Sequence, residues 1–565
     1  MPDVVVIGSG HNGLVAAATL ASRGRSVVVL ERMRDFGGRL APFAPFPGFN
    51  ASPCIDHGGQ LRPALCESLA LARHGLRLYP IDPLVFAPSG SESLTLWRDD
   101  SATQAEIARF STHDARRWVD FRRFLRTAAA FLERVADTAP PSLDTTDVAQ
   151  LLEAGRLGMR FSLMGRDRMV ALIRMLTMSM ADFLDEWFET PLLKAAVAAP
   201  ALTGSFHGPL APATAGLLAW RAVADAQGLR PEGSGDWISP LLAVCRARGV
   251  VLRENAAVVE VLCTGGRASG VRLADGSAIE AGTVIADVDP RYVPDLLAPG
   301  AIATRFVEEV EEIKSRGLCA RIFLRMRELP RFACEVRDAQ LKGRIHFGAD
   351  LFALERAWDA ARRGRCADRP LVEMWIPSLG NPKVAPAGEH LVTLTVTGVP
   401  YRLAQGSWGE GKELFADNVI AHLVPEIPNL REAVTQRLVL LPCDLERAYG
   451  LPGGHLLHGE TGLDQWFVGR PVASAARYET PLPGLYLCGT GTHSGGGAVS
   501  GASGALCADE IALKADGAIA AREKNRRIVT GAVGIGLALA GAGLAARGAW
   551  LKLSNGSSKA AGEKN

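Results

Sequence analysis

The chain has 565 residues, of which 48% are hydrophobic and 22% charged, and its formal net charge is +2. This length allows two or three ordinary domains, and the composition is that of a folded globular protein, which excludes a wholly disordered chain. The near-neutral charge and the lack of a long basic run ahead of the C-terminal tail argue against nucleic acid as a partner.

Ten cysteines are scattered along the chain, and no two of them have CxxC or similar spacing. Neither a disulfide framework nor a metal site is therefore predicted. The apolar start of the chain has no basic segment and runs straight into a glycine-rich turn, which is unlike a secretory signal. We expect a reducing, cytoplasmic location.

The first forty residues have the pattern of a strand–helix–strand unit. Residues 3–8 predict a buried strand, residues 14–24 a helix of small residues, and residues 26–30 a second strand. The turn between the first strand and the helix reads Gly8-Ser9-Gly10-His11-Asn12-Gly13. This GxGxxG in this context is the fingerprint of a dinucleotide-binding unit, whereas an isolated glycine turn would be weak evidence.

The fingerprint assigns a role to each residue. Gly8 allows the tight turn, Gly10 lets the backbone approach a pyrophosphate, and Gly13 lets the helix pack close to the strand. The helix N-terminus offers N–H groups and a positive dipole end to the phosphates. Glu31, eighteen residues after Gly13, is placed to accept hydrogen bonds from ribose hydroxyls.

A second glycine pair, Gly37-Gly38, is followed by Arg39. It resembles the GG motif of the FAD-dependent amine oxidase and phytoene desaturase superfamily, in which the glycines turn against the diphosphate and the arginine adds charge. That family usually has an arginine two residues before the pair, where this chain has Asp35. The resemblance implies that the cofactor is FAD and that Gly38 and Arg39 contact it.

The C-terminal part of the chain contains another strand, at 485–488, followed by a glycine-rich loop and a helix from about Ala498. This resembles the C-terminal flavin motif of the same superfamily, where the helix start faces the flavin ring and favours its reduction. The resemblance implies that the loop and helix contact the flavin, although Thr490 replaces the acid of some members and a plain surface loop is the alternative. The implied contacts are Gly489, Thr490, Gly491 and Val499.

Residues 249–289 alternate between strands and turns, with one turn at Asp275-Gly276. In the superfamily such a segment returns to the dinucleotide sheet, and one of its valines touches the adenine. Val258 matches that valine. An ordinary sheet valine is the alternative interpretation.

The predicted fold class is α/β, with a discontinuous Rossmann-type FAD-binding domain, an inserted mixed α+β substrate domain and a C-terminal apolar helix. The inserted pieces are helical at 104–135 and 166–199 and mix strands, such as 391–399, with helices. The predicted pieces are 1–80, 225–300 and 440–515 for the FAD-binding domain, 81–224 and 301–439 for the substrate domain, and 516–565 for the tail.

Within the tail, residues 528–546 carry no charge, which reaches the lower limit for a membrane span. The segment either contacts a membrane or forms a small-residue helix that lies on the protein. If it spans a membrane, the basic residues before it place the body of the protein on the cytoplasmic side.

A narrower resemblance rests on Gly10-His11-Asn12-Gly13-Leu14, which looks like the GHNGL of one branch of the superfamily. That branch includes phytoene desaturase-like enzymes, flavin-type β-carotene ketolases and proteins like the animal pyridine-nucleotide-disulfide-oxidoreductase-domain protein 2. The resemblance extends over about residues 3–512. It implies an oxidoreductase acting on an apolar, carotenoid-like or other isoprenoid lipid, by desaturation, saturation or ketolation. Further matching segments are 54–57, 185–188, 377–390, 444–460 and 489–497.

Hydride transfer to a flavin needs a dry pocket and a group that handles the accompanying proton. Three histidines are candidates for that group: His493 beside the glycine loop, His57 next to Asp56, and His458 close to His455 and Glu460. A structural hydrogen bond is the alternative role for each, and we expect His11 to be structural.

Two further classes of function are less favoured. A flavin amine oxidase needs an aromatic cage, and only 6% of the residues are aromatic. A non-enzymatic, membrane-tethered flavoprotein is the third possibility. Because the chain lacks a redox cysteine pair and a second GxGxxG, the expected electron acceptor is oxygen or a quinone rather than a nicotinamide.

Overall fold

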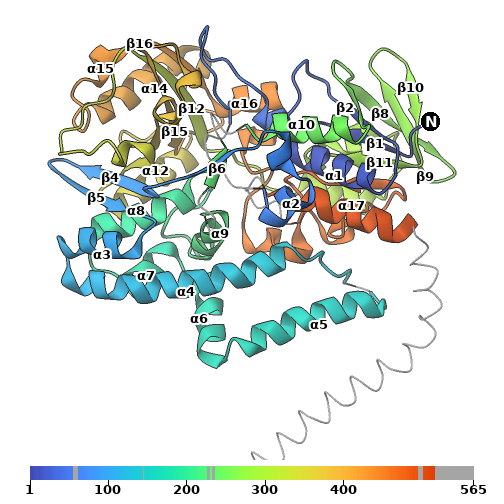
Figure 1. Ribbon diagram of the computed structural model, residues 1–565, viewed down its shortest axis with the longest axis horizontal. Helices are drawn as coiled ribbons and strands as arrows, with labels where there is room; N and C mark the ends of the chain where they lie inside the picture. Colours follow the sequence, from blue (N-terminus) through green and yellow to red (C-terminus); the bar gives the residue numbers. More distant parts are fainter. Residues whose placement is uncertain (55–60, 144, 226–228, 232–235, 494–499, 516–565) are drawn as a thin grey trace, which may run out of the picture.

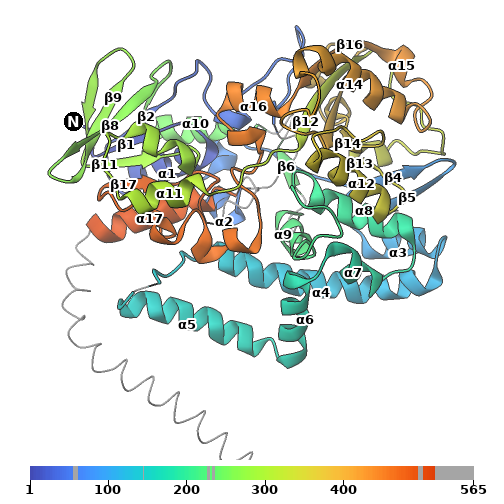
Figure 2. The same cartoon turned by 180° about the vertical axis from the view of Figure 1, so that it is seen from behind.

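The computed structural model describes residues 1–54, 61–143, 145–225, 229–231, 236–493 and 500–515. A small parallel sheet forms one end of the molecule and a larger sheet the other, with a group of helices along one side (Figure 1). The opposite view shows the same division (Figure 2).

Five parallel strands form the smaller sheet, in the order β17-β11-β1-β2-β7. Their bounds are β1 (Val4–Ile7), β2 (Val27–Leu30), β7 (Val251–Arg253), β11 (Thr283–Ala286) and β17 (Leu485–Leu487). The strands come from all three segments predicted to share one domain, so distant parts of the chain meet in one sheet. This arrangement confirms the α/β, Rossmann-like class, while the exact domain bounds stay a prediction.

Alternating side chains of the central strand β1 pack against layers on opposite faces of the sheet. Val4 and Val6 pack against helices, whereas Val5 and Ile7 pack against a second, antiparallel sheet, as the period of a strand buried on both faces requires. The helices are α1 (His11–Ser22), α10 (Ile238–Ala247) and α17 (Ala502–Ala515). The antiparallel strands are β8 (Val258–Thr264), β9 (Arg267–Leu273) and β10 (Ala278–Glu280).

Seven strands form the larger sheet, in the order β16-β12-β15-β14-β13-β4-β5. One face, which includes Ile322 and Leu394, packs against Phe415 of α14 (Trp408–Leu423). The alternate residues Arg321 and Thr395 are also buried, so the other face contains polar groups. The bounds are β4 (Val85–Ser89), β5 (Glu92–Leu96), β12 (Cys319–Met326), β13 (Arg344–Phe347), β14 (Leu371–Trp375), β15 (His390–Thr397) and β16 (Val434–Leu440).

The helical region begins with α3 (Asp100–Ala108) and α4 (Thr112–Ala136). Helix α4 starts where the Ser111 hydroxyl accepts a hydrogen bond from the Asp114 N–H at 3.1 Å. Its core face repeats every three or four residues, at Trp118, Phe121 and Leu125. The next helices are α5 (Val148–Leu163), α6 (Arg166–Thr177), α7 (Met180–Asp185), α8 (Pro191–Leu202) and α9 (Gly216–Asp225).

The remaining elements connect these layers. The short strands β3 (Leu78–Pro80) and β6 (Leu229–Pro231) pair with each other. The remaining α-helices are α2 (Pro63–Ser68), α11 (Thr304–Glu311), α12 (Leu351–Arg362), α13 (Pro377–Gly380), α15 (Leu430–Ala433) and α16 (Pro442–Tyr449).

Two predictions concern the C-terminal end. The helix expected from about Ala498 begins, within the described residues, at Ala502. The apolar segment 528–546 lies outside the described residues. None of the helices that the structure does describe has the length and apolar character needed to cross a membrane.

Replacing Trp358 of α12 would test how tightly the core of the helical region is packed. Its side chain is fully buried, and its indole N–H donates to the Ser205 carbonyl at 2.9 Å. Trp358→Phe leaves that carbonyl unpaired, so we expect a loss of about 1–3 kcal/mol in the free energy of unfolding, measured by urea denaturation. Phe352→Leu, an exposed site on the same helix, should change stability by less than ~0.5 kcal/mol. Equal losses in both variants would contradict this assignment.

Candidate functional site

A cavity of about 370 Å³ lies at the carboxyl ends of β1, β2 and β11, which is where open parallel sheets bind their ligands. Residues from both ends of the chain line it. The predicted site residues among them are Gly8, Gly10, Glu31, Gly38, Arg39, Val258, His458 and Thr490.

Glu31 joins the two glycine motifs. Its carboxylate accepts hydrogen bonds from the Ser9 N–H at 3.1 Å and the Ser9 hydroxyl at 2.5 Å. The Ser9 hydroxyl accepts in turn from the Gly37 N–H at 2.9 Å. The other carboxylate oxygen accepts from the Met33 N–H at 3.0 Å. These bonds fix the carboxylate at the end of β2, on the wall of the cavity.

Asp287, the residue after β11, is a cavity residue that sequence reasoning missed. One of its carboxylate oxygens accepts from the Gly13 N–H, in the first turn of α1, at 2.9 Å. The same oxygen would lie 2.5 Å from a Cβ on Gly10 and 2.7 Å from one on Gly13. The glycines therefore make room for a carboxylate of the protein itself, in addition to their predicted roles.

The ionisation of Asp287 is set by its surroundings. Burial, helped by the nearby Glu31 carboxylate, raises the pKa of its carboxyl to about 7, although the hydrogen bond from the Gly13 N–H opposes the shift. A sequence signal was available, because Asp287 follows directly on an apolar strand predicted to return to the dinucleotide sheet.

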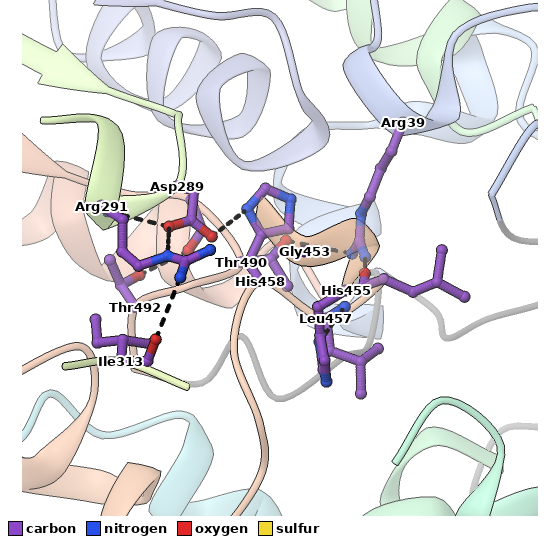
Figure 3. A network of polar contacts seen from close by, with 12 residues as sticks. Arg39, Asp289, Arg291, Ile313, Gly453, His455, Leu457, His458, Thr490 and Thr492 are labelled. Atoms are coloured by element: carbon purple, nitrogen blue, oxygen red, sulfur yellow. Dashed lines mark hydrogen bonds and ion pairs between the residues drawn. The ribbon is translucent and has the colours of Figure 1, made fainter. Parts of the chain in front are cut away.

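Arg39 connects the second glycine pair to the C-terminal glycine-rich loop (Figure 3). Its guanidinium is buried and donates to the Thr490 hydroxyl at 3.2 Å and to the Leu456 carbonyl. Burial lowers the pKa of Arg39 to about 10, which still leaves the side chain positively charged at neutral pH. The cavity therefore contains a buried cation beside the acids Glu31 and Asp287.

His458 reaches the cavity with Asp289 beside it. Its Nδ1 lies 3.5 Å from a carboxylate oxygen of Asp289, whose other oxygen accepts from the Arg291 N–H at 3.0 Å (Figure 3). Burial lowers the pKa of His458, and the Asp289 carboxylate partly offsets that effect. The neighbouring His455 accepts from the Leu457 N–H, and burial lowers its pKa to about 4.

Arg470 organises the loop that holds these groups. Its buried guanidinium donates to five backbone carbonyls at 3.0–3.3 Å. Those of Leu457, His458 and Glu460 precede it, and those of Thr490 and Thr492 follow it. One side chain thus ties the His458 segment to the predicted flavin loop.

Three other predicted residues, Gly489, Gly491 and His493, pack against other parts of the chain. A Cβ on Gly489 would lie 2.9 Å from the Val288 carbonyl, and one on Gly491 would lie 2.5 Å from Pro290, so both glycines permit close backbone packing. His493 is buried, with Nε2 3.1 Å from the Val135 carbonyl at the end of α4, and burial lowers its pKa to about 4.

Two of the predicted site residues, His57 and Val499, lie outside the described residues, as does Asp56. His11, expected to be structural, is buried at the start of α1 and lines the cavity. The ten cysteines are all free thiols. Of the three candidate histidines, His458 lines the cavity, whereas His493 faces the helical region.

Known proteins match the sequence of this chain over most of its length. Residues 6–61 match the NAD(P)-binding Rossmann-like domain family. Pyridine nucleotide-disulfide oxidoreductase domain-containing protein 2 of Mus musculus is 33% identical, covering 89% of this chain and 92% of that protein. A component of the limonene dehydrogenase of Castellaniella defragrans is 24% identical over 93% of this chain and 98% of that protein. A neurosporene-forming phytoene desaturase of Cereibacter sphaeroides is 25% identical over 87% and 91%.

Solved structures share the fold at lower identity. An oxidoreductase from Methanosarcina mazei has a TM-score of 0.56 and 17% identity, covering 90% of this chain and 99% of that one. Putrescine oxidase with bound putrescine has a TM-score of 0.55 and 15% identity, covering 91% and 99%. The chain therefore shares its fold with these two oxidoreductases.

Asp287 should make dinucleotide binding depend on pH. Above about pH 7 its carboxyl ionises and adds negative charge to a cavity that would face the anionic pyrophosphate of a bound dinucleotide. We expect the affinity for a dinucleotide, measured by fluorescence titration with FAD as the probe, to fall several-fold as the pH rises from about 6 to about 8. In Asp287→Asn, which keeps the hydrogen bond from Gly13, the affinity should vary much less. An unchanged pH profile in that variant would refute this role.

Arg470 should matter for stability. Arg470→Lys keeps the charge but cannot reach five carbonyls, so we expect a loss of about 2–4 kcal/mol in the free energy of unfolding. The matched variant Arg305→Lys alters an arginine whose side chain is 84% exposed and should lose less than ~0.5 kcal/mol. Urea denaturation measures both, and comparable stability of Arg470→Lys and wild type would disprove the assignment.

Proposed function

The chain belongs to the family of pyridine nucleotide-disulfide oxidoreductase domain-containing protein 2, and from that premise we propose that it is an FAD-dependent oxidoreductase of apolar, isoprenoid-like substrates. Its place among the FAD-type oxidoreductases of the amine oxidase and phytoene desaturase superfamily follows from the relatives and the fold. The cofactor and the substrate class are the proposed part.

The observation that supports FAD most strongly is the cavity that brings together the residues of four separate motifs. Glu31 would bind the ribose hydroxyls, and the N–H groups at the start of α1 would bind the pyrophosphate. Val258 lines the cavity and would contact the adenine, and the buried Arg39 and Thr490, joined by a hydrogen bond, line it too. The residues present therefore fit the dinucleotide portion of FAD.

FAD, when bound, supplies an acceptor for the hydride that leaves a substrate carbon. The residues of the chain orient the reactants, exclude water and handle the proton. Because Nδ1 of His458 faces Asp289, the proton of the neutral ring would reside on Nδ1, leaving Nε2 to accept a proton from the substrate. The lowered pKa of His458 keeps the ring neutral, as a base requires.

Two relatives support an apolar substrate, because their names specify limonene and phytoene, both isoprenoid hydrocarbons. Binding such a molecule needs no ionised partner in the pocket, and a dry pocket also protects hydride transfer from competing reactions. Desaturation fits this chemistry directly and saturation is its reverse, whereas ketolation would also need water or oxygen as the source of the carbonyl oxygen. We propose oxygen or a quinone as the electron acceptor, because the ten cysteines are free thiols and offer no redox disulfide.

The cofactor assignment has a direct test. The purified protein should show the visible absorption of bound flavin, and Glu31→Gln should weaken FAD binding about 10–100-fold through the loss of charge-assisted hydrogen bonds. Glu260→Gln, on the exposed edge strand β8, is the matched control and should bind normally. A well-folded, colourless protein that takes up no FAD would overturn the proposal.

The substrate class is tested by anaerobic mixing of the flavin-loaded protein with candidate molecules. Bleaching of the flavin absorption by a polyene or a monocyclic terpene supports the proposal. Bleaching by a diamine such as putrescine and not by these lipids would make the protein an amine oxidase. If neither class bleaches the flavin, the redox role on apolar lipids is refuted.

A further inference from the structure

Helices α5 and α6 expose an unusual amount of apolar surface. They lie on the outside of the helical region, and α5 extends away from the larger lobe (Figures 1 and 2). The exposed large side chains on and just before these helices, with their exposed fractions, are Leu143 (72%), Val148 (38%), Leu151 (40%), Leu152 (56%), Met159 (58%), Leu163 (77%), Val170 (49%) and Ile173 (50%).

The exposed residues of α5 share one side of the helix. At 100° per residue, the positions of Val148, Leu151, Leu152, Met159 and Leu163 fall within an arc of about 120°. The opposite side faces α4, where the ring of Phe161 lies 5.4 Å from that of Phe131. The helix therefore has one apolar side that packs on the protein and another that meets the solvent.

Positive charge accompanies this apolar surface. Between residues 148 and 174 the sequence contains five arginines and two acids, Glu153 and Asp167. Arg174 pairs with Glu186. The other four arginines, Arg156, Arg160, Arg166 and Arg168, are exposed. Their long side chains can lay their apolar stems along the surface and extend the charged group beyond it.

We propose that the α5–α6 face, defined as the exposed side of residues 148–174, docks onto the surface of an anionic lipid bilayer. Exposed apolar side chains flanked by arginines are what an interfacial helix inserts among acyl chains and anionic headgroups. A second copy of the chain fits less well, because a two-fold contact would bring the arginines of both copies together. This inference is independent of the cofactor and of residues 528–546.

The test is co-sedimentation of the full-length protein with vesicles. We expect binding to vesicles of phosphatidylcholine with 30% phosphatidylglycerol, and binding at least about tenfold weaker to pure phosphatidylcholine or in ~0.5 M salt. Leu152→Glu combined with Leu163→Glu should abolish binding. Arg160→Gln combined with Arg166→Gln should weaken it about tenfold. The matched control combines Phe352→Glu with Leu414→Glu, two equally exposed residues on α12 and α14, and should bind like the wild type.

Three results would overturn the proposal. The first is a wild-type protein that does not sediment with anionic vesicles. The second is unchanged binding of the Leu152→Glu, Leu163→Glu variant, which would place membrane contact elsewhere in the chain. The third is an equal loss in the Phe352→Glu, Leu414→Glu control. Analytical ultracentrifugation checks the rival occupant: a wild-type dimer that dissociates in the Leu152→Glu, Leu163→Glu variant, without vesicle binding, would identify a second copy instead.

Discussion

The contact between one carboxylate and the glycine turn after β1 sets the geometry of the cofactor cavity. Asp287 accepts a hydrogen bond from Gly13 and occupies the space where side chains of Gly10 and Gly13 would lie. The start of α1, the end of β11 and the floor of the cavity are fixed together by this contact. Any residue larger than glycine at these positions would displace the carboxylate or the helix, because its Cβ would lie only 2.5–2.7 Å from the Asp287 carboxylate oxygen.

Buried arginines extend this arrangement to the C-terminal part of the chain. Arg39 joins the second glycine pair to Thr490, and Arg470 gathers carbonyls from two segments around one guanidinium. Burying a guanidinium costs free energy unless its N–H groups have hydrogen-bond acceptors. In both side chains, backbone carbonyls provide these acceptors. The result is a cavity wall whose parts are distant in sequence and rigidly connected.

Local patterns predicted the elements of this site well. The strands expected at 3–8, 26–30 and 485–488 are present as Val4–Ile7, Val27–Leu30 and Leu485–Leu487, because each depends on neighbouring residues. The helix expected over 14–24 spans His11–Ser22, so it begins inside the glycine turn. The role of Asp287 was missed because its partner Gly13 is 274 residues away in the sequence. The apolar strand before Asp287 indicated its place at the edge of the sheet but did not indicate this contact. His493 shows the same limit: its place in the chain suggested the cavity, but its ring contacts the end of α4. The apolar exposure of α5 was hidden too, because its periodicity is that of any amphipathic helix.

The order of strands in the smaller sheet has a consequence for biosynthesis. Its central strand β1 leaves the ribosome first, while its neighbour β11 and the edge strand β17 follow near residues 283 and 485. Synthesis proceeds at about 5–20 residues per second, so Asp287 and Thr490 would be made on the order of tens of seconds after the glycine turn. Until then the nascent N-terminal segment exposes an apolar strand edge, which is a surface that chaperones recognise. Binding of the proposed cofactor would therefore be a late event, completed only when almost the whole polypeptide has been made.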